Sequence, residues 1–101
     1  MIDLSKTKDF DWDHGNKEKN RTKHGVTPRE CEEVFINTPI FIIEDLVHSQ
    51  TEQRLQVRGK TNAGRLLSLV YTMRNQRIRI ISARDQSKRE REFYEKAQTN
   101  T

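Results

Sequence analysis

The chain has 101 residues, which is enough for one domain and too few for two separate hydrophobic cores. A hydrophobic fraction of 32% against a charged fraction of 34% predicts a modest core, and the single cysteine, Cys31, excludes an internal disulfide. The net charge of +4 favours polyanions or acidic proteins as partners. The sequence shows no export signal and no apolar stretch of membrane-spanning length, so we expect a cytoplasmic protein.

The first part of the chain predicts a short strand and two helices. Residues 10–13 alternate aromatic and acidic side chains, as a half-buried strand does. Polar helix formers fill residues 16–24, and Gly25 after them is typical of a left-handed helix cap. A threonine, a proline and a glutamate then form a capping-box pattern, which predicts a second helix over residues 28–36.

After residue 39 the apolar residues recur with the period of a strand. Four strands are predicted, over residues 40–47, 53–58, 65–72 and 77–83. Their short connections predict an antiparallel meander. In the last strand Ile78 and Ile80 alternate with Arg77 and Arg79, so both arginines should project from the face without the apolar core. A capping box at Ser87 opens a final helix, which completes an α+β fold of order β-α-α-β-β-β-β-α with helices packed on a small antiparallel sheet.

A series of short motifs runs along nearly the whole chain, at residues 10–13, 20, 23–26, 33–35, 52, 54, 59, 66–72, 79–84 and 90–95. In this order and spacing the series resembles the BrnT toxins. The resemblance implies a RelE-like ribonuclease that cuts mRNA, either free or bound to the ribosome. By this activity it would inhibit translation as the toxin of a type II toxin–antitoxin pair. It also implies a ribbon-helix-helix antitoxin, a complex of two toxins with two antitoxins, and contact with operator DNA only through the antitoxin.

RNA cleavage without a metal uses the 2′-hydroxyl to attack the phosphate, so the protein must help deprotonation and stabilise the phosphorane. Arg54, Arg79 and Arg84 are the candidate phosphate clamp, because guanidinium groups match phosphate oxygens and stay charged; ordinary exposed cations would look the same. His24 could be the general base or acid, or could only serve the last carbonyls of its helix. Glu52 could orient Arg54 or take the 2′-hydroxyl proton, although a cross-strand ion pair is the simpler interpretation.

Four further residues are candidates for RNA binding. Lys23 would offer charge to a phosphate rather than transfer a proton, and a solvated helix end is the alternative. Arg77 and Lys88 would contact the RNA backbone, and the basic residues of the last helix could instead face solvent or the antitoxin. Tyr71 could stack on a base or donate a proton, but its alternation with two leucines makes a core position the default.

Other functions are disfavoured or remain open. His14, His24 and His48 lack the spacing of paired metal ligands, and no glycine-rich phosphate loop or serine elbow is present, so we expect no metal site and no cofactor. An RNA-binding chaperone is disfavoured because no strand carries an aromatic stripe. A non-catalytic basic module that holds an antitoxin and co-represses operator DNA remains the alternative function, because charge alone does not distinguish it from a nuclease.

Overall fold

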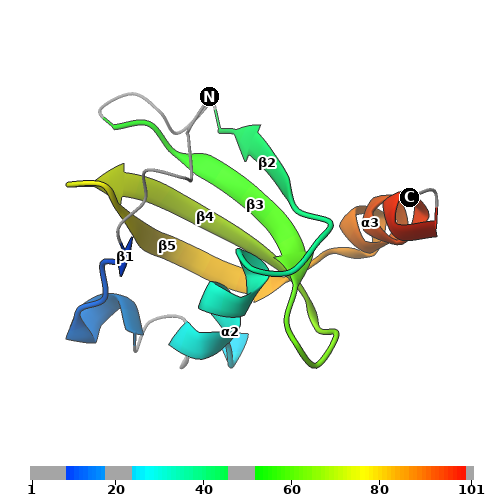
Figure 1. Ribbon diagram of the computed structural model, residues 1–101, viewed down its shortest axis with the longest axis horizontal. Helices are drawn as coiled ribbons and strands as arrows, with labels where there is room; N and C mark the ends of the chain where they lie inside the picture. The colour runs from blue at the N-terminus through cyan, green and yellow to red at the C-terminus, as the bar shows by residue number, and fades with distance from the viewer. Residues whose placement is uncertain (1–8, 18–23, 46–51, 100–101) are drawn as a thin grey trace.

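The computed structural model describes residues 9–17, 24–45 and 52–99. Figure 1 shows a twisted sheet with α2 and α3 at different sides of it. The elements are β1 (Asp9–Phe10), α2 (Pro28–Val34), β2 (Phe41–Glu44), β3 (Leu55–Lys60), β4 (Leu66–Arg74), β5 (Arg77–Asp85) and α3 (Lys88–Thr99). Residues 14–17 are also helical. The predicted helix over 16–24 lies mainly outside the described residues, as does the end of the predicted strand over 40–47.

The sheet has five strands in the order β1-β5-β4-β3-β2. The predicted antiparallel meander is confirmed for β2 to β5. The prediction of a purely antiparallel sheet is wrong, because β1 pairs with β5 in parallel, with Asp9 opposite Arg77 and Phe10 opposite Ile78. These two strands are joined through the helices and the whole meander, so no short turn dictates their relative direction.

The predicted first strand is shorter than expected because its last residue caps a helix. Asp13 Oδ1 accepts a hydrogen bond from the Asn16 backbone N–H at 2.9 Å, and Asn16 Oδ1 accepts one from the Asp13 N–H at 2.7 Å. Aspartate is among the best N-cap residues, because its carboxylate satisfies an N–H group of the first turn. Asp13 therefore starts the helical segment at His14 instead of continuing β1.

The two predicted capping boxes are confirmed. Thr27 and Glu30 exchange side-chain to backbone hydrogen bonds at the start of α2. Ser87 and Glu90 do the same at the start of α3, at 2.8 and 3.2 Å. Gly25 has the expected left-handed conformation, with a φ of 63°. The helix predicted over 28–36 ends at Val34, two residues early.

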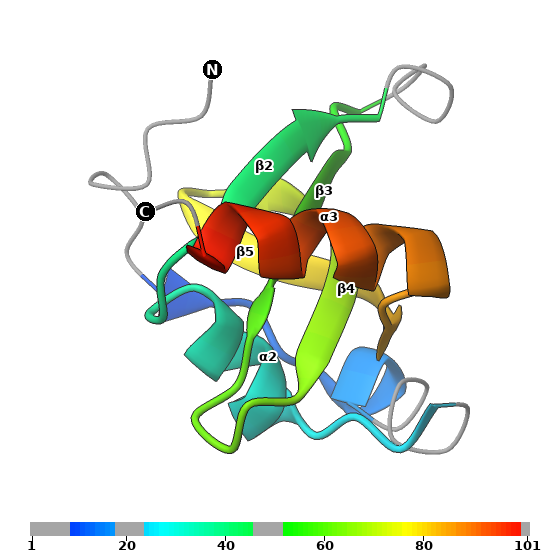
Figure 2. The same ribbon diagram turned by 90° about the vertical axis from the view of Figure 1, so that its right-hand side faces the viewer.

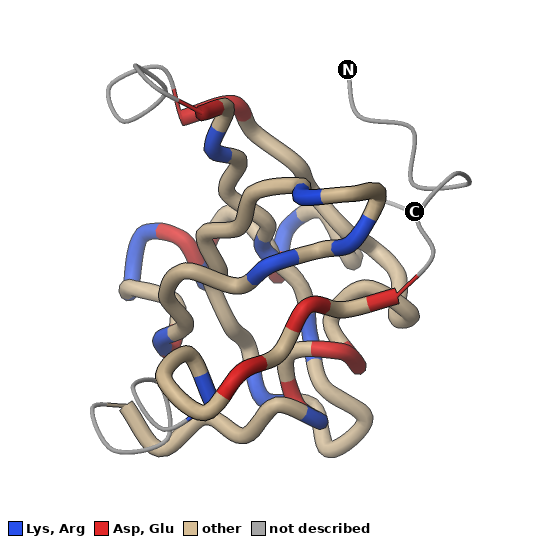
Figure 3. The backbone as a smooth tube through the Cα atoms, turned by 90° about the vertical axis from the view of Figure 1, so that its left-hand side faces the viewer, with Lys and Arg blue, Asp and Glu red and all other residues tan. Residues whose placement is uncertain are grey.

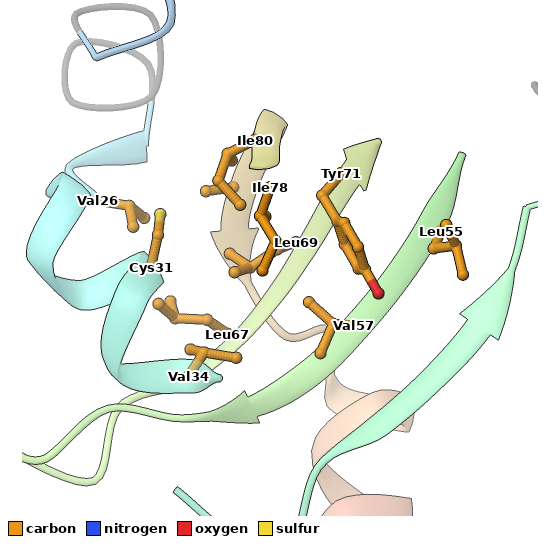
Figure 4. Close-up of a cluster of buried hydrophobic side chains, with 11 residues drawn as sticks. Val26, Cys31, Val34, Leu55, Val57, Leu67, Leu69, Tyr71, Ile78 and Ile80 are labelled. Atoms are coloured by element: carbon orange, nitrogen blue, oxygen red, sulfur yellow. The ribbon is translucent and has the colours of Figure 1, made fainter. Parts of the chain in front are cut away.

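The core lies between α2 and one face of the sheet, as Figure 4 shows. Cys31 and Val34 of α2 are fully buried against inward-facing residues of three strands, which are Leu55, Val57, Leu67, Leu69, Tyr71, Ile78 and Ile80. Gly59 of β3 lies directly under α2, since a Cβ there would be 2.8 Å from Val34 Cγ1. Trp12 packs at the margin of this core, and its Nε1 donates to Glu32 Oε2 at 2.8 Å.

A β-bulge in β5 changes which face its later residues occupy. Tyr71 is opposite Ile80 and Val70 is opposite Ser82, so Ile81 is an extra residue in β5. Strict alternation would place Arg84 on the core face with Ile80. The extra residue shifts the alternation and moves Arg84 to the opposite face, the one that carries Arg79.

Arg65 connects four segments that are distant in the sequence. Its guanidinium contacts Asp85 at 2.8 Å and Glu30 at 3.1 Å. It also donates to the backbone carbonyls of Gly25 and His24, at 2.9 and 3.2 Å. One side chain just before β4 thus joins the end of β5, the first turn of α2 and the turn that precedes α2.

Candidate functional site

The sheet face opposite α2 carries a group of arginines that includes Arg54, Arg58, Arg79 and Arg84, and it is called the arginine face below. Side chains of cross-strand neighbours align on one face. Arg58, Ser68 and Arg84 form one such row, and Thr72 and Arg79 belong to another. Ser68 and Thr72 are four residues apart on β4, so the two rows are separated by about 13 Å at 3.3 Å per residue. The arginine face is therefore long enough to contact a nucleic acid strand at two points.

One row ends in an open cavity of about 410 Å³, called the Arg79 cavity below. Its charged lining residues are Asp13, Glu52, Arg54, Arg74 and Arg79. Three residues predicted as catalytic from the sequence, Arg54, Arg79 and Glu52, are thus brought together. Arg84 is on the same face but outside this cavity.

Two aspartates of the N-terminal segment hold Arg79 in place. Its Nη2 contacts Asp13 Oδ2 at 2.7 Å, and its Nη1 lies 3.5 Å from Asp11 Oδ2. Figure 3 shows the acidic positions after β1 beside the basic positions of the β4–β5 end. The Asn16 backbone N–H and the Arg79 guanidinium keep the pKa of Asp13 below its usual value. Sequence reasoning missed this role of Asp13, and only its helix-capping pattern could have indicated that its carboxylate is turned away from β1.

Glu52 forms the cross-strand ion pair that was the simpler interpretation, but its partner is Arg74. The two Arg74 nitrogens lie 3.0 and 3.3 Å from the Glu52 carboxylate. This hydrogen bonding lowers the pKa of Glu52, and the charges of Arg54 and Arg79 add to the effect. The cavity thus contains a carboxylate that is ionised at neutral pH and surrounded by guanidinium groups.

A second cluster lies at the α3 end of the arginine face. Arg84 holds the Glu90 carboxylate with two bonds, at 2.7 and 3.1 Å, and Arg58 Nη2 approaches it to 3.3 Å. The bond from Arg84 is the main cause that lowers the pKa of Glu90 to about 2, and the Ser87 backbone contributes. Two guanidinium groups therefore bind the Glu90 carboxylate, and the same arrangement could bind a phosphate group.

The remaining predicted residues lie away from the Arg79 cavity. Lys23 is outside the described residues. The residues that line the cavity do not include His24, whose backbone carbonyl is bound by Arg65. Arg77 lines a neighbouring depression with Asp11, Arg74 and Asn75. Lys88 is exposed in the first turn of α3.

Tyr71 lies in the core, which contradicts its candidate role in RNA binding. Its side chain is fully buried, and its ring packs edge-to-face on Phe35 with 5.2 Å between centroids. Burial raises the pKa of the Tyr71 hydroxyl to about 12. The ring therefore cannot stack on a base without leaving the core.

The described residues contain no cluster of three or more His, Cys, Asp or Glu side chains suited to a metal ion. No helix in the described ranges is both long enough and apolar enough to cross a membrane. Burial raises the pKa of the Cys31 thiol to about 12, so this side chain stays protonated at neutral pH and is a core residue.

A family model for BrnT, the ribonuclease toxin of a type II toxin–antitoxin system, matches residues 12–90. The chain belongs to the BrnT family. The crystal structure of the ribonuclease toxin BrnT of Brucella abortus has a similar fold, with a TM-score of 0.59 and 21% sequence identity over 81% of this chain and 100% of that chain. At this identity the likeness concerns the fold alone. The comparison with curated proteins gave no match.

Membership in the BrnT family makes this chain a ribonuclease toxin of a type II toxin–antitoxin system, with an antitoxin as partner and RNA as substrate. The matched residues include the whole charged lining of the Arg79 cavity and the Arg84–Glu90 pair. The α+β architecture expected from the sequence agrees with that of the Brucella toxin.

Proposed function

We propose that this BrnT family member is an endoribonuclease that cuts mRNA without a metal ion and thereby inhibits translation. The observation that carries the proposal is the convergence of Arg54, Arg79 and Glu52 in one open cavity on the arginine face. Two guanidinium groups can stabilise the phosphorane and an ionised carboxylate can accept the 2′-hydroxyl proton, which are two of the tasks in cleavage through the 2′-hydroxyl.

In this mechanism the RNA strand lies across the arginine face with its scissile phosphate in the Arg79 cavity. Arg79 and Arg54 bind the non-bridging oxygens and stabilise the dianionic phosphorane. Asp13 is a positioning residue, because its 2.7 Å contact fixes the direction of the Arg79 guanidinium. The two cations bind more strongly in the transition state than in the ground state, since the charge on the phosphate increases as the 2′-oxygen attacks.

Glu52 is the proton acceptor in this proposal. Its carboxylate is ionised because Arg74 lowers its pKa. When a phosphate draws Arg74 away, that lowering is partly lost and the carboxylate becomes a stronger base. The 2′-oxygen then bonds to phosphorus, its proton moves to Glu52, and the 5′-oxygen leaves with a proton from water. The products are a 2′,3′-cyclic phosphate and a 5′-hydroxyl end.

Arg84 and Arg58 bind a second phosphate of the same strand, which displaces the Glu90 carboxylate from them. Both phosphate sites are on one face, about 13 Å apart by the strand geometry. Arg77 and Lys88, on the rim of this face, add charge for the RNA backbone farther along the strand.

The antitoxin is proposed from the family resemblance to be a ribbon-helix-helix protein that neutralises the toxin in a complex of two copies of each. Operator DNA is bound through the antitoxin in this proposal. The α+β domain is, on the same ground, a RelE-like fold. Because the arginine face is rich in basic side chains, we propose that the antitoxin segment that contacts it carries acidic side chains.

The experiment that tests the function uses purified, antitoxin-free protein with end-labelled RNA in excess EDTA. The wild type should leave 2′,3′-cyclic phosphates, and Arg79→Ala should reduce the rate roughly 100- to 1,000-fold, as expected for the loss of one preorganised group. Arg29→Ala is the matched control, because Arg29 lies on α2 across the sheet and its side chain is 87% exposed. Circular dichroism of each variant checks the fold.

If naked RNA is not cut, the same assay is repeated with ribosome-bound message. Absence of cleavage there too overturns the nuclease proposal and favours the non-catalytic binding module. Equal activity of Arg79→Ala and wild type would leave a nuclease with a different active site.

A further inference from the structure

Phe93 is an exposed aromatic residue at the α3 end of the arginine face. Phe93 is a large apolar residue, and yet 56% of it is exposed. Single exposed apolar residues are common on protein surfaces and need no function by themselves. The residues around Phe93, however, indicate a binding role for its ring.

The Phe93 ring is held in place by its contacts. It packs edge-to-face on Phe41 of β2, with 5.5 Å between centroids and 70° between ring planes. The next residue, Tyr94, is fully buried, contacts the same Phe41 ring, and donates its hydroxyl hydrogen to the Pro39 carbonyl at 2.6 Å. Figure 2 shows α3 crossing in front of the strands at this end of the sheet. The ring is therefore preorganised and loses little conformational entropy when a ligand binds.

Two surface depressions meet at Phe93. The first, of about 420 Å³, is also lined by Arg58, Ser87, Arg89 and Glu90. The second, of about 580 Å³, is also lined by Arg89, Glu92, Glu95, Lys96 and Thr99. Phe93 is thus a wall of both, and Arg89 borders both. The Arg89 guanidinium makes no ion pair with any residue in the described ranges.

The first depression continues the arginine face. Arg58, which borders it, is the cross-strand neighbour of Ser68, and Ser68 is the neighbour of Arg84. A strand of RNA that leaves the Arg79 cavity along the arginine face would therefore reach Phe93 after the Arg58–Arg84 row.

We propose that Phe93 is a stacking platform for an unpaired base of the RNA, with Arg58 and Arg89 binding the adjoining phosphates. A fixed aromatic ring beside guanidinium groups is the arrangement that binds single-stranded RNA, because bases stack on the ring and cations track the backbone. The proposal rests on the proposed function for the path of the RNA. Family membership assigns no role to Phe93, which lies beyond the matched residues 12–90.

The two guanidinium groups beside the Phe93 ring, those of Arg58 and Arg89, favour RNA over a protein partner as the occupant. The lining residues next to Phe93 are mostly charged or polar. The basic lining residues Arg58, Arg89 and Lys96 are balanced in number by the acidic residues Glu90, Glu92 and Glu95, so the ring and the two arginines of the first depression carry the proposal, and net charge does not. A nucleotide presents an apolar base face and an anionic phosphate, which match the ring and the arginines.

The test measures binding of single-stranded RNA in which every 2′-hydroxyl is methylated, so that the toxin cannot cut it. A series of these RNAs carries the fluorescent base 2-aminopurine at successive positions. Phe93→Leu keeps an apolar side chain against Phe41 and removes the aromatic ring, and Phe93→Trp restores one. Ile36→Ala is the control, because Ile36 is an apolar residue with 76% exposure after the end of α2.

Stacking of one base predicts that Phe93→Leu weakens binding roughly 5- to 150-fold. Wild type and Phe93→Trp should quench 2-aminopurine at one position of the series, and Phe93→Leu should not. Ile36→Ala should bind as wild type does. Thermal unfolding of Phe93→Leu near the wild-type midpoint would show that α3 is still in place.

Equal RNA binding by Phe93→Leu and wild type would overturn the proposal. Loss of antitoxin binding in Phe93→Leu with unchanged RNA binding would assign the surface to the protein partner instead, and would also overturn it. Cleavage of unmodified RNA is measured separately, so failure of the proposed nuclease activity and failure of the stacking site are distinguishable.

Discussion

Replacement of Glu90 by glutamine tests how much the Glu90 carboxylate, which connects α3 to the sheet, contributes to the free energy of unfolding. Glu90 caps α3 and lies between Arg84 and Arg58. The hydrogen bond from Arg84, the Ser87 backbone N–H and the charges of both arginines lower its pKa from 4.5 to about 2. If this whole shift were stability it would correspond to roughly 3 kcal/mol. The Arg84 side chain is 41% exposed, so water screens the pair and we expect Glu90→Gln to lower the free energy of unfolding by about 1 to 1.5 kcal/mol at pH 7.

The same interaction predicts a pH dependence with a definite sign. The pKa of Glu90 is lower in the folded state than in the unfolded chain, so its stabilisation is complete above pH 4.5 and is lost as the pH falls towards 2. The difference in free energy of unfolding between wild type and Glu90→Gln should therefore be largest at pH 7 and should fall to roughly a quarter of that value at pH 2.5. Urea unfolding followed by circular dichroism measures this difference.

Glu95→Gln is the matched control, because Glu95 is an exposed glutamate on the same helix. It should unfold like the wild type at both pH values. A difference for Glu90→Gln that is as large at pH 2.5 as at pH 7 would refute the ion-pair reasoning and leave only helix capping. The same variant should bind uncleavable RNA several-fold more tightly, since Arg84 and Arg58 no longer have to release a carboxylate.

Three further predictions concern the core. Gly59→Ala should lower the free energy of unfolding by about 1 to 3 kcal/mol in urea, because the new methyl group would lie 2.8 Å from Val34 Cγ1 and 3.2 Å from its carbonyl oxygen; unchanged stability would contradict the close packing of α2. Tyr71→Phe should leave RNA cleavage unchanged and the stability equal or up to about 1 kcal/mol higher, because the buried hydroxyl has no hydrogen-bond partner within the described residues; lost cleavage in a folded variant would refute this. Cys31 should react with a thiol reagent only as fast as the protein unfolds, and rapid labelling of the native state would show that the thiol is accessible.

Local features of the fold could be predicted from the sequence, because a few adjacent residues determine them. The capping boxes at Thr27 and Ser87 and the left-handed Gly25 are of this kind. The meander follows from short turns between strands. The direction of β1 could not be predicted, because its partner β5 is far away along the chain and pairing depends on how the helices cross the sheet.

The candidate site was predictable as a set of residue types but not as an arrangement. Arg54 and Arg79 were recognised by their chemistry and by the alternation of their strands. Arg84 is on their face only because Ile81 is an extra residue in β5, which a regular alternation pattern cannot indicate. The carboxylates of Asp13 and Glu90, which hold two of the arginines, come from other elements, and only the folded chain brings them together.

The four partners of Arg65 have a consequence for the folding kinetics. They lie 20 to 41 residues away along the chain, so the guanidinium finds them only after the sheet and the α2 region have docked. Contacts that form after the folding transition state determine the unfolding rate of a protein and have little effect on its folding rate. We therefore predict that Arg65→Ala shortens the lifetime of the native toxin and leaves its refolding rate nearly unchanged, as measured by stopped-flow unfolding and refolding in urea.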